Sequence, residues 1–133
     1  MKQIALIEKG ADGTYSIYTA HTTSTIVGEG QTVAEAKADF ELALQEYYKT
    51  YQELGEEIPE ELRGVEIEYK YDIPSLFNNF DFINVSKFAR YAGINASLLR
   101  QYKTGDTYIS EAQAKKIETA LHRIGEELTA ISL

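Results

Sequence analysis

The stretch from Asn84 to Gly105 constrains the chain most, because its glycines and its apolar spacing favour two short helices joined by a tight turn. The first helix is expected over residues 85–92, where apolar residues recur at three- and four-residue intervals. Gly93 ends this helix, since glycine readily adopts the left-handed conformation that a turn needs. Asn95 is a suitable N-cap for a second helix, residues 96–104, which Gly105 ends.

The second of these helices has an apolar face and a polar face. Either Leu98 or Leu99 is expected to be buried together with Tyr102. The polar side chains would then point outward: Ser97, Arg100, Gln101 and Lys103. A small Ala89, a turn glycine four positions later and the apolar Ile94 describe a helix-turn-helix. The alternative that this pattern leaves open is a helical hairpin that binds protein, or that binds nothing.

The residues Phe88-Ala89, Ala92-Gly93-Ile94, Ser97, Leu99 and Gly105 resemble the helix-turn-helix of Cro and the phage repressors. In that family the second helix enters the major groove of double-stranded DNA. The resemblance implies that Ala96, Ser97 and Arg100 face bases, and arginine can pair bidentately with guanine. It also places four residues near phosphates: Asn84, Val85, Lys103 and Thr104. Gln101, which points outward from the same helix, completes the expected DNA-binding set.

The distribution of charge is compatible with this reading although the net charge is −8. Residues 1–71 contain six basic and 14 acidic side chains, which give −8. Residues 84–116 contain six basic and two acidic side chains, which give +4. An acidic body with one basic face is typical of a chain that binds nucleic acid through that face alone.

The composition limits the remaining functional classes. The chain has no cysteine, which excludes disulfides and thiolate metal sites and agrees with a cytoplasmic location. His21 and His122 are the only imidazoles and lie far apart in the sequence, so we expect no metal and no other cofactor. No stretch approaches the roughly 20 apolar residues that span a membrane, so no membrane partner is expected. The first residues are interpreted as a strand rather than a signal peptide.

The pattern of the first half predicts the order β-β-β-α-β. Strands are expected at residues 2–8, 15–20, 22–27 and 65–71, with a turn at Gly28-Glu29-Gly30. Thr32 and Glu35 form a capping box that starts a long helix, and Gly55 ends it. We therefore predict an α+β fold with an α/β domain at residues 1–73. A small all-α domain at 74–133 would contain a helix at 75–79, the helix-turn-helix, and a helix from 111 to about 131.

This order of elements, with Gly28-Glu29-Gly30-Gln31-Thr32-Val33-Ala34-Glu35-Ala36, resembles the HicB antitoxin family. The resemblance implies a degenerate, noncatalytic relative of the ribonuclease H fold that grips a small, basic HicA-like toxin. It also implies that the C-terminal domain represses the operon. We accordingly expect a transcriptional regulator and antitoxin that acts as a homodimer or a higher homo-oligomer. Three tyrosines of the long helix are candidate partner-binding residues, because tyrosine is enriched at interfaces: Tyr47, Tyr48 and Tyr51.

Other interpretations of the same residues stay open. Residues 20–24 replace a loop that commonly contains proline and glycine in the family, which leaves room for a solitary regulator without a toxin. A protein-interaction module that does not bind DNA is the main alternative. An enzyme is not expected, because Glu66 and Glu68 share their strand face with Lys70, which indicates a solvent face rather than a two-metal nuclease centre. We therefore assign no catalytic residue.

Overall fold

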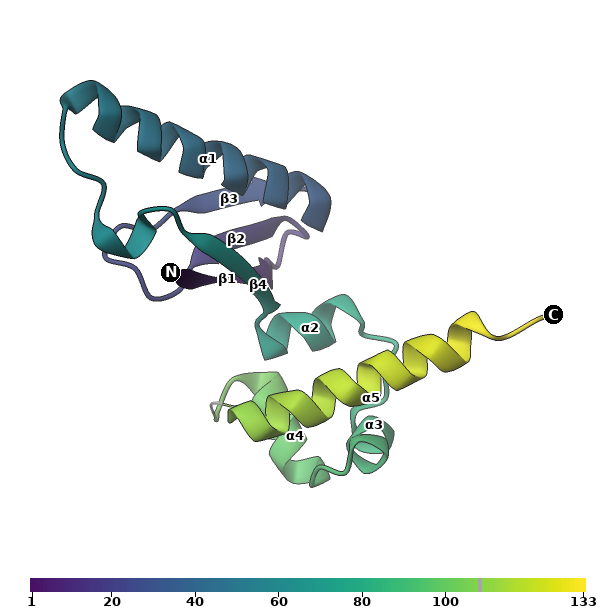
Figure 1. Cartoon of the computed structure of the whole chain (residues 1–133). Helices are drawn as coiled ribbons and strands as arrows, with labels where there is room; N and C mark the ends of the chain where they lie inside the picture. The colour runs from purple at the N-terminus through teal and green to yellow at the C-terminus, as the bar shows by residue number, and fades with distance from the viewer. Residues whose placement is uncertain (108) are drawn as a thin grey trace. The chain divides into compact units, whose positions relative to one another are not determined.

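The computed structural model describes residues 1–107 and 109–133, and in these residues the fold is α+β, with a four-stranded mixed sheet and five α-helices (Figure 1). The chain divides into two compact units, Met1–Asn79 and Phe80–Leu133. The division falls after the predicted boundary at residues 73 and 74, because α2 (Ile73–Asn79) packs against β1 (Lys2–Lys9). The Lys9 amide donates to Ser75 Oγ at 3.2 Å, and the Tyr15 hydroxyl donates to Asn79 Oδ1. These contacts assign α2 to the N-terminal unit.

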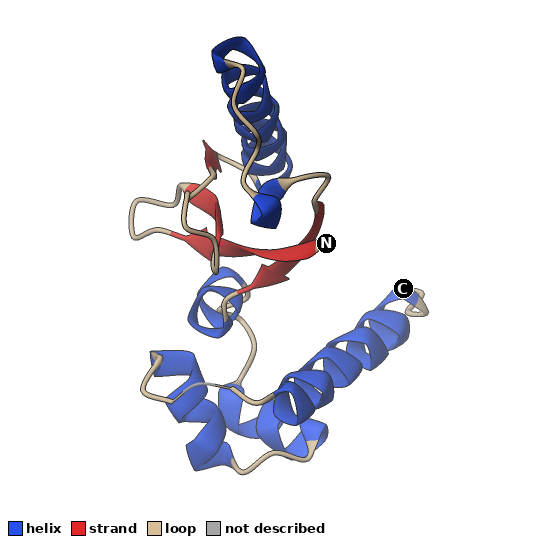
Figure 2. Cartoon of the chain, turned by 60° about the vertical axis from the view of Figure 1, so that its left-hand side comes forward, coloured by secondary structure: helices blue, strands red, loops and turns tan. Residues whose placement is uncertain are grey.

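The sheet has the strand order β3-β2-β1-β4, with β2 at Tyr15–Thr19, β3 at Val27–Gly30 and β4 at Glu66–Tyr71. The pairs β1–β2 and β2–β3 are antiparallel, and β4 runs parallel to β1 after the crossover through α1 (Val33–Leu54). Figure 2 shows α1 against one face of the sheet and α2 on the other side. The predicted order β-β-β-α-β is therefore confirmed.

The core of the N-terminal unit lies between α1 and the sheet. Its buried side chains come from alternate positions of β1 and β2, from one stripe of α1, from the residue before β3 and from the 3-10 turn at Glu60–Leu62: Ala5, Ile7, Ile17, Ile26, Ala36, Phe40, Leu44 and Leu62. The α1 N-terminus is capped as predicted, with Thr32 Oγ accepting from the Glu35 amide at 3.1 Å. The Glu35 carboxylate accepts from the amide of Gln31 at 2.9 Å rather than from Thr32 itself. Gly55 ends the helix with a φ of 68°.

The prediction for the third strand was wrong. Residues 22–25 form a loop, in which the Thr22 hydroxyl donates to Thr19 Oγ1 and to the Ser24 carbonyl. The strand is instead Val27–Gly30, which includes the predicted glycine turn. A Cβ atom at Gly28 would lie 2.2 Å from the Phe40 amide nitrogen. These glycines are therefore required by the close approach of α1 and not by a turn.

The C-terminal unit consists of α3 (Val85–Ala92), α4 (Ala96–Thr104) and α5 (Glu111–Thr129). The bounds of α3 and α4 agree with the prediction, and α5 ends two residues before the predicted end at about residue 131. The predicted apolar stripe of α5 is only partly covered, since Ile117 is buried but Leu128 is 58% exposed. The buried side chains of this unit come from all three helices and the turn: Phe88, Ala89, Ile94, Leu99, Tyr102, Ile117 and Ala120.

Tyr69 of β4 makes the N-terminal unit sensitive to alkaline pH. Partial burial, followed by the charge of Glu41 and a 3.3 Å hydrogen bond to its carboxylate, raises the Tyr69 pKa to about 12 from an ordinary 10.0. The folded chain therefore holds this proton more tightly than the unfolded chain does, and the resulting stabilisation is lost as pH rises from 10 to 12. Urea unfolding of wild type and Tyr69→Phe should show a smaller loss over this range in the variant. Equal losses would contradict the assignment.

Candidate nucleic-acid interface

Backbone capping sets the geometry of the α3–turn–α4 segment. Asn84 Oδ1 accepts from the Lys87 amide at 2.9 Å and starts α3. Gly93 has a φ of 75° and ends α3, and the following Ile94 amide donates to the Ala89 carbonyl at 2.9 Å. Asn95 Oδ1 then accepts from the first amides of α4. Because each end of the turn has its own cap, the direction of α4 relative to α3 is closely defined.

Packing decides which face of α4 is available. Leu99 and Tyr102 are buried and Leu98 is half-buried, which resolves the alternative that the sequence left open. The small Ala89 of α3 is fully buried, and Ile94 in the turn is only 6% exposed. The opposite face of α4 is exposed and carries Ser97, Arg100, Gln101, Lys103 and Thr104.

The eight predicted DNA-binding residues differ in how far their side chains are already engaged. The Asn84 side chain caps α3, and Val85 and Ala96 are half-buried. The Thr104 hydroxyl donates to nearby oxygens, including Asp106 Oδ2 at 2.8 Å, and Gln101 Oε1 accepts from Thr107. In the part of the chain that the structure describes, the side chains of Ser97, Arg100 and Lys103 form no hydrogen bond or ion pair and are exposed. These three are the side chains most available to a ligand.

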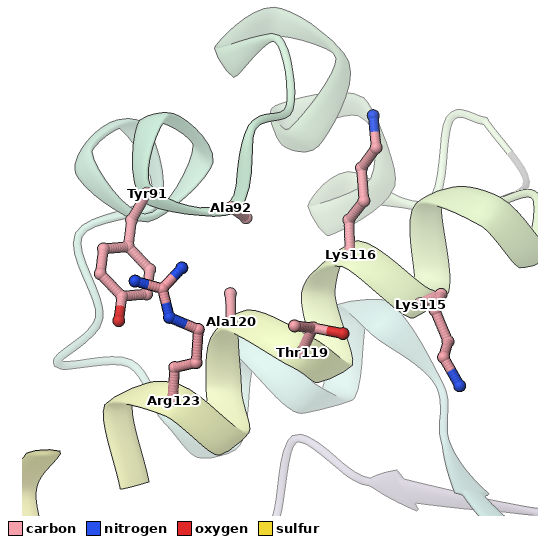
Figure 3. A pocket seen from close by; sticks show the side chains of 7 residues that line it. All are labelled: Tyr91, Ala92, Lys115, Lys116, Thr119, Ala120 and Arg123. Atoms are coloured by element: carbon pink, nitrogen blue, oxygen red, sulfur yellow. The ribbon is translucent and has the colours of Figure 1, made fainter. Parts of the chain in front are cut away.

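A second basic feature is a pocket of about 180 Å³ between α3 and α5. The sequence pattern did not predict this pocket. Three cations and no carboxylate line this pocket. The complete lining is Tyr91, Ala92, Lys115, Lys116, Thr119, Ala120 and Arg123. Figure 3 shows the Arg123 guanidinium over the Tyr91 ring, 4.9 Å from its centroid, while the two lysines extend in opposite directions. The cations therefore enlarge the basic surface without converging on one point. No local sequence signal links Tyr91 to Arg123, because their contact depends on how α3 packs against α5.

The three tyrosines predicted to bind a partner lie along α1 and are half-buried. The Tyr47 ring contacts the rings of Tyr48 and Tyr51, with centroids 6.3 and 4.9 Å apart. The Tyr48 hydroxyl donates to the Leu62 carbonyl, which ties α1 to the 3-10 turn at Glu60–Leu62. Tyr48 thus has a structural contact, and Tyr51 lines a shallow hollow that also contains Glu60 and Glu61.

No group of three or more histidine, aspartate or glutamate side chains in the described residues is placed to hold a metal ion. None of the helices in residues 1–107 and 109–133 combines the length and the apolar character needed to cross a membrane.

Protein-family models, curated proteins and solved structures were compared with the chain, and none of the three comparisons finds a match.

Proposed function

We propose that this chain is a DNA-binding transcriptional regulator that reads duplex DNA with the exposed face of α4. The observation that carries the proposal is the capped α3–turn–α4 segment, whose second helix exposes Ser97, Arg100 and Lys103 with no partner in the described part of the chain. Helix-turn-helix proteins contact base edges with the first turns of such a helix, and their flanking cations contact phosphates. Arg100 is the proposed base reader and Lys103 the proposed phosphate contact.

The electrostatics of the two units support this proposal. Residues 1–79 contain six basic and 15 acidic side chains, a charge of −9, whereas residues 80–133 contain seven basic and six acidic ones, a charge of +1. All seven basic side chains of residues 80–133 lie on α3, α4 and α5. Phosphate would be repelled by the first unit and attracted to the second, so the electrostatics orient the chain on DNA.

The acidic first unit supports a partner-binding role in the same protein. We propose that it occludes a small, basic toxin ribonuclease, as the HicB resemblance implies, while the second unit represses the shared promoter. Complementary charge would accelerate the encounter of such partners. If a small basic ribonuclease is encoded beside this chain, its co-expression with the chain should suppress RNA cleavage. A solitary regulator would bind DNA and leave the ribonuclease active.

The DNA-binding proposal is tested by the salt dependence of affinity for a random duplex pool, measured by fluorescence anisotropy. A dimer that neutralises about three phosphates per protomer should give a log–log slope of about −5. Lys103→Ala should weaken binding to every sequence alike and flatten the slope by about one per lost contact. Lys49→Ala is the matched control, since Lys49 is an exposed lysine of α1 in the acidic unit. Absence of binding at low salt would favour the interaction module instead.

A further inference from the structure

The two edges of the sheet differ in how their backbone groups are satisfied. At the β3 edge, the amides of Glu29 and Gln31 donate to carboxylates of α1, namely Asp39 Oδ2 at 2.8 Å and Glu35 Oε2 at 2.9 Å. The Thr19 amide bonds to the Ile26 carbonyl, so the backbone groups of residues 26, 28 and 30 face β2 and those between them face outward. The carboxylates therefore occupy the donors that an added strand would need.

The β4 edge has no such protection. The Glu66 amide donates to the carbonyl of Met1, just before β1, and the Asp72 amide donates to the carbonyl of Ile7 within β1. Alternation along the strand then directs the backbone groups of residues 67, 69 and 71 away from β1. Within the described residues these outward amides and carbonyls bond to nothing. An unprotected edge of this kind is a template for another strand.

We propose that the β4 edge is the interface between two copies of this chain, paired as antiparallel strands about a twofold axis at Tyr69. In this register Tyr69 exchanges both backbone hydrogen bonds with the same residue of the second copy, and Ile67 does so with Tyr71 of that copy. Glu68 then lies opposite Lys70 of the second copy, on the solvent face, and the pairing occurs twice because of the symmetry. The result is one continuous eight-stranded sheet.

Charge and shape favour a second copy as the occupant of this edge. Glu68 and Lys70 are about half exposed, and their only ion pair in the described residues is a loose one to each other at 3.8 Å, so both can turn to a partner strand. Ile67, Tyr69 and Tyr71 lie on the other face, where they pack in part against the core, and their remaining exposed surface would form a shared apolar row. The helix α1 packs mainly over β3 and β2 and contacts β4 through the Tyr69 side chain. Like charges meet only at the ends, where Glu66 lies opposite Asp72, a residue already bonded to Ser75.

This inference stands apart from DNA binding, although a twofold dimer would supply the two copies that paired half-sites require. It is tested by sedimentation equilibrium of the full chain, whose protomer mass is 15.0 kDa. Wild type should sediment at twice this mass. Glu68→Lys alone places lysines opposite each other and Lys70→Glu alone places glutamates opposite each other. Each single variant should therefore weaken association about tenfold or more.

Mixing the two variants is the decisive experiment. A Glu68→Lys chain beside a Lys70→Glu chain has only opposite charges across the strands, so the equimolar mixture should regain wild-type association. Circular dichroism of each variant excludes misfolding, and hydrogen exchange at residues 67, 69 and 71 should slow as protein concentration rises.

A monomeric wild type, or single variants that associate normally, would overturn the β4 interface. Arg100→Ala should leave association unchanged, so loss of DNA binding with an intact dimer counts against the proposed function alone.

Discussion

Gly28→Ala should destabilise the N-terminal unit by about 3 kcal/mol or more. The new Cβ atom would lie 2.2 Å from the amide nitrogen and 2.4 Å from the Cα of Phe40, and both are backbone atoms that no rotamer change can move. Either α1 must lift from β3 or the strand must shift, and both changes open the contact that buries Phe40 and Ala36. The measurement is urea unfolding of the full chain, monitored by circular dichroism.

Gly125→Ala is the matched control for this substitution. Gly125 lies inside α5, and an added Cβ atom there would meet nothing within 4 Å. Alanine should therefore stabilise that helix by about 0.5–1 kcal/mol, because it loses less backbone entropy on folding than glycine does. A wild-type unfolding midpoint for Gly28→Ala would show that α1 and β3 are less closely packed than the structure has them.

Arg100→Ala should lower the affinity for the preferred duplex by about 1–3 kcal/mol, which is the discrimination that one bidentate contact to guanine provides. The loss should be much smaller on random duplex, so the ratio of specific to non-specific affinity falls. Folding should be unaffected, since the Arg100 side chain is exposed and forms no hydrogen bond or ion pair with the residues that the structure describes. The measurement is anisotropy with a selected duplex and with the random pool.

Arg63→Ala provides the control for the loss of an arginine in the acidic unit. Arg63 is exposed, pairs loosely with Glu57 at 3.8 Å and donates to the Ile58 carbonyl, with its Nη2 at 2.8 Å. Its removal should change neither affinity nor sequence preference. If Arg100→Ala weakened all duplexes equally, Arg100 would be a phosphate contact and base readout would lie elsewhere on α4.

The elements that the sequence predicted well are those whose ends depend on local chemistry. Asn84, Gly93, Asn95 and Gly105 cap helices through hydrogen bonds to residues two to four positions away, so the bounds of α3 and α4 could be derived without knowing the fold. The same holds for Thr32 at the start of α1. The outward face of α4 followed in turn, because helical periodicity determines which side chains share a face.

Contacts between distant segments decided the rest. The glycines of β3 resemble a turn in sequence, but they lie in a strand that α1 approaches too closely for any side chain. The helix α2 belongs to the N-terminal unit because Ser75 and Asn79 bond to the β1–β2 hairpin. The Tyr91–Arg123 stack and the unequal sheet edges likewise depend on packing.

The sequence by itself thus determined the capped helices and the polar face of α4, since these depend on neighbours along the chain. Only the tertiary structure decided which strand edge stays open and which residues meet across helices, because those contacts join residues far apart in the sequence.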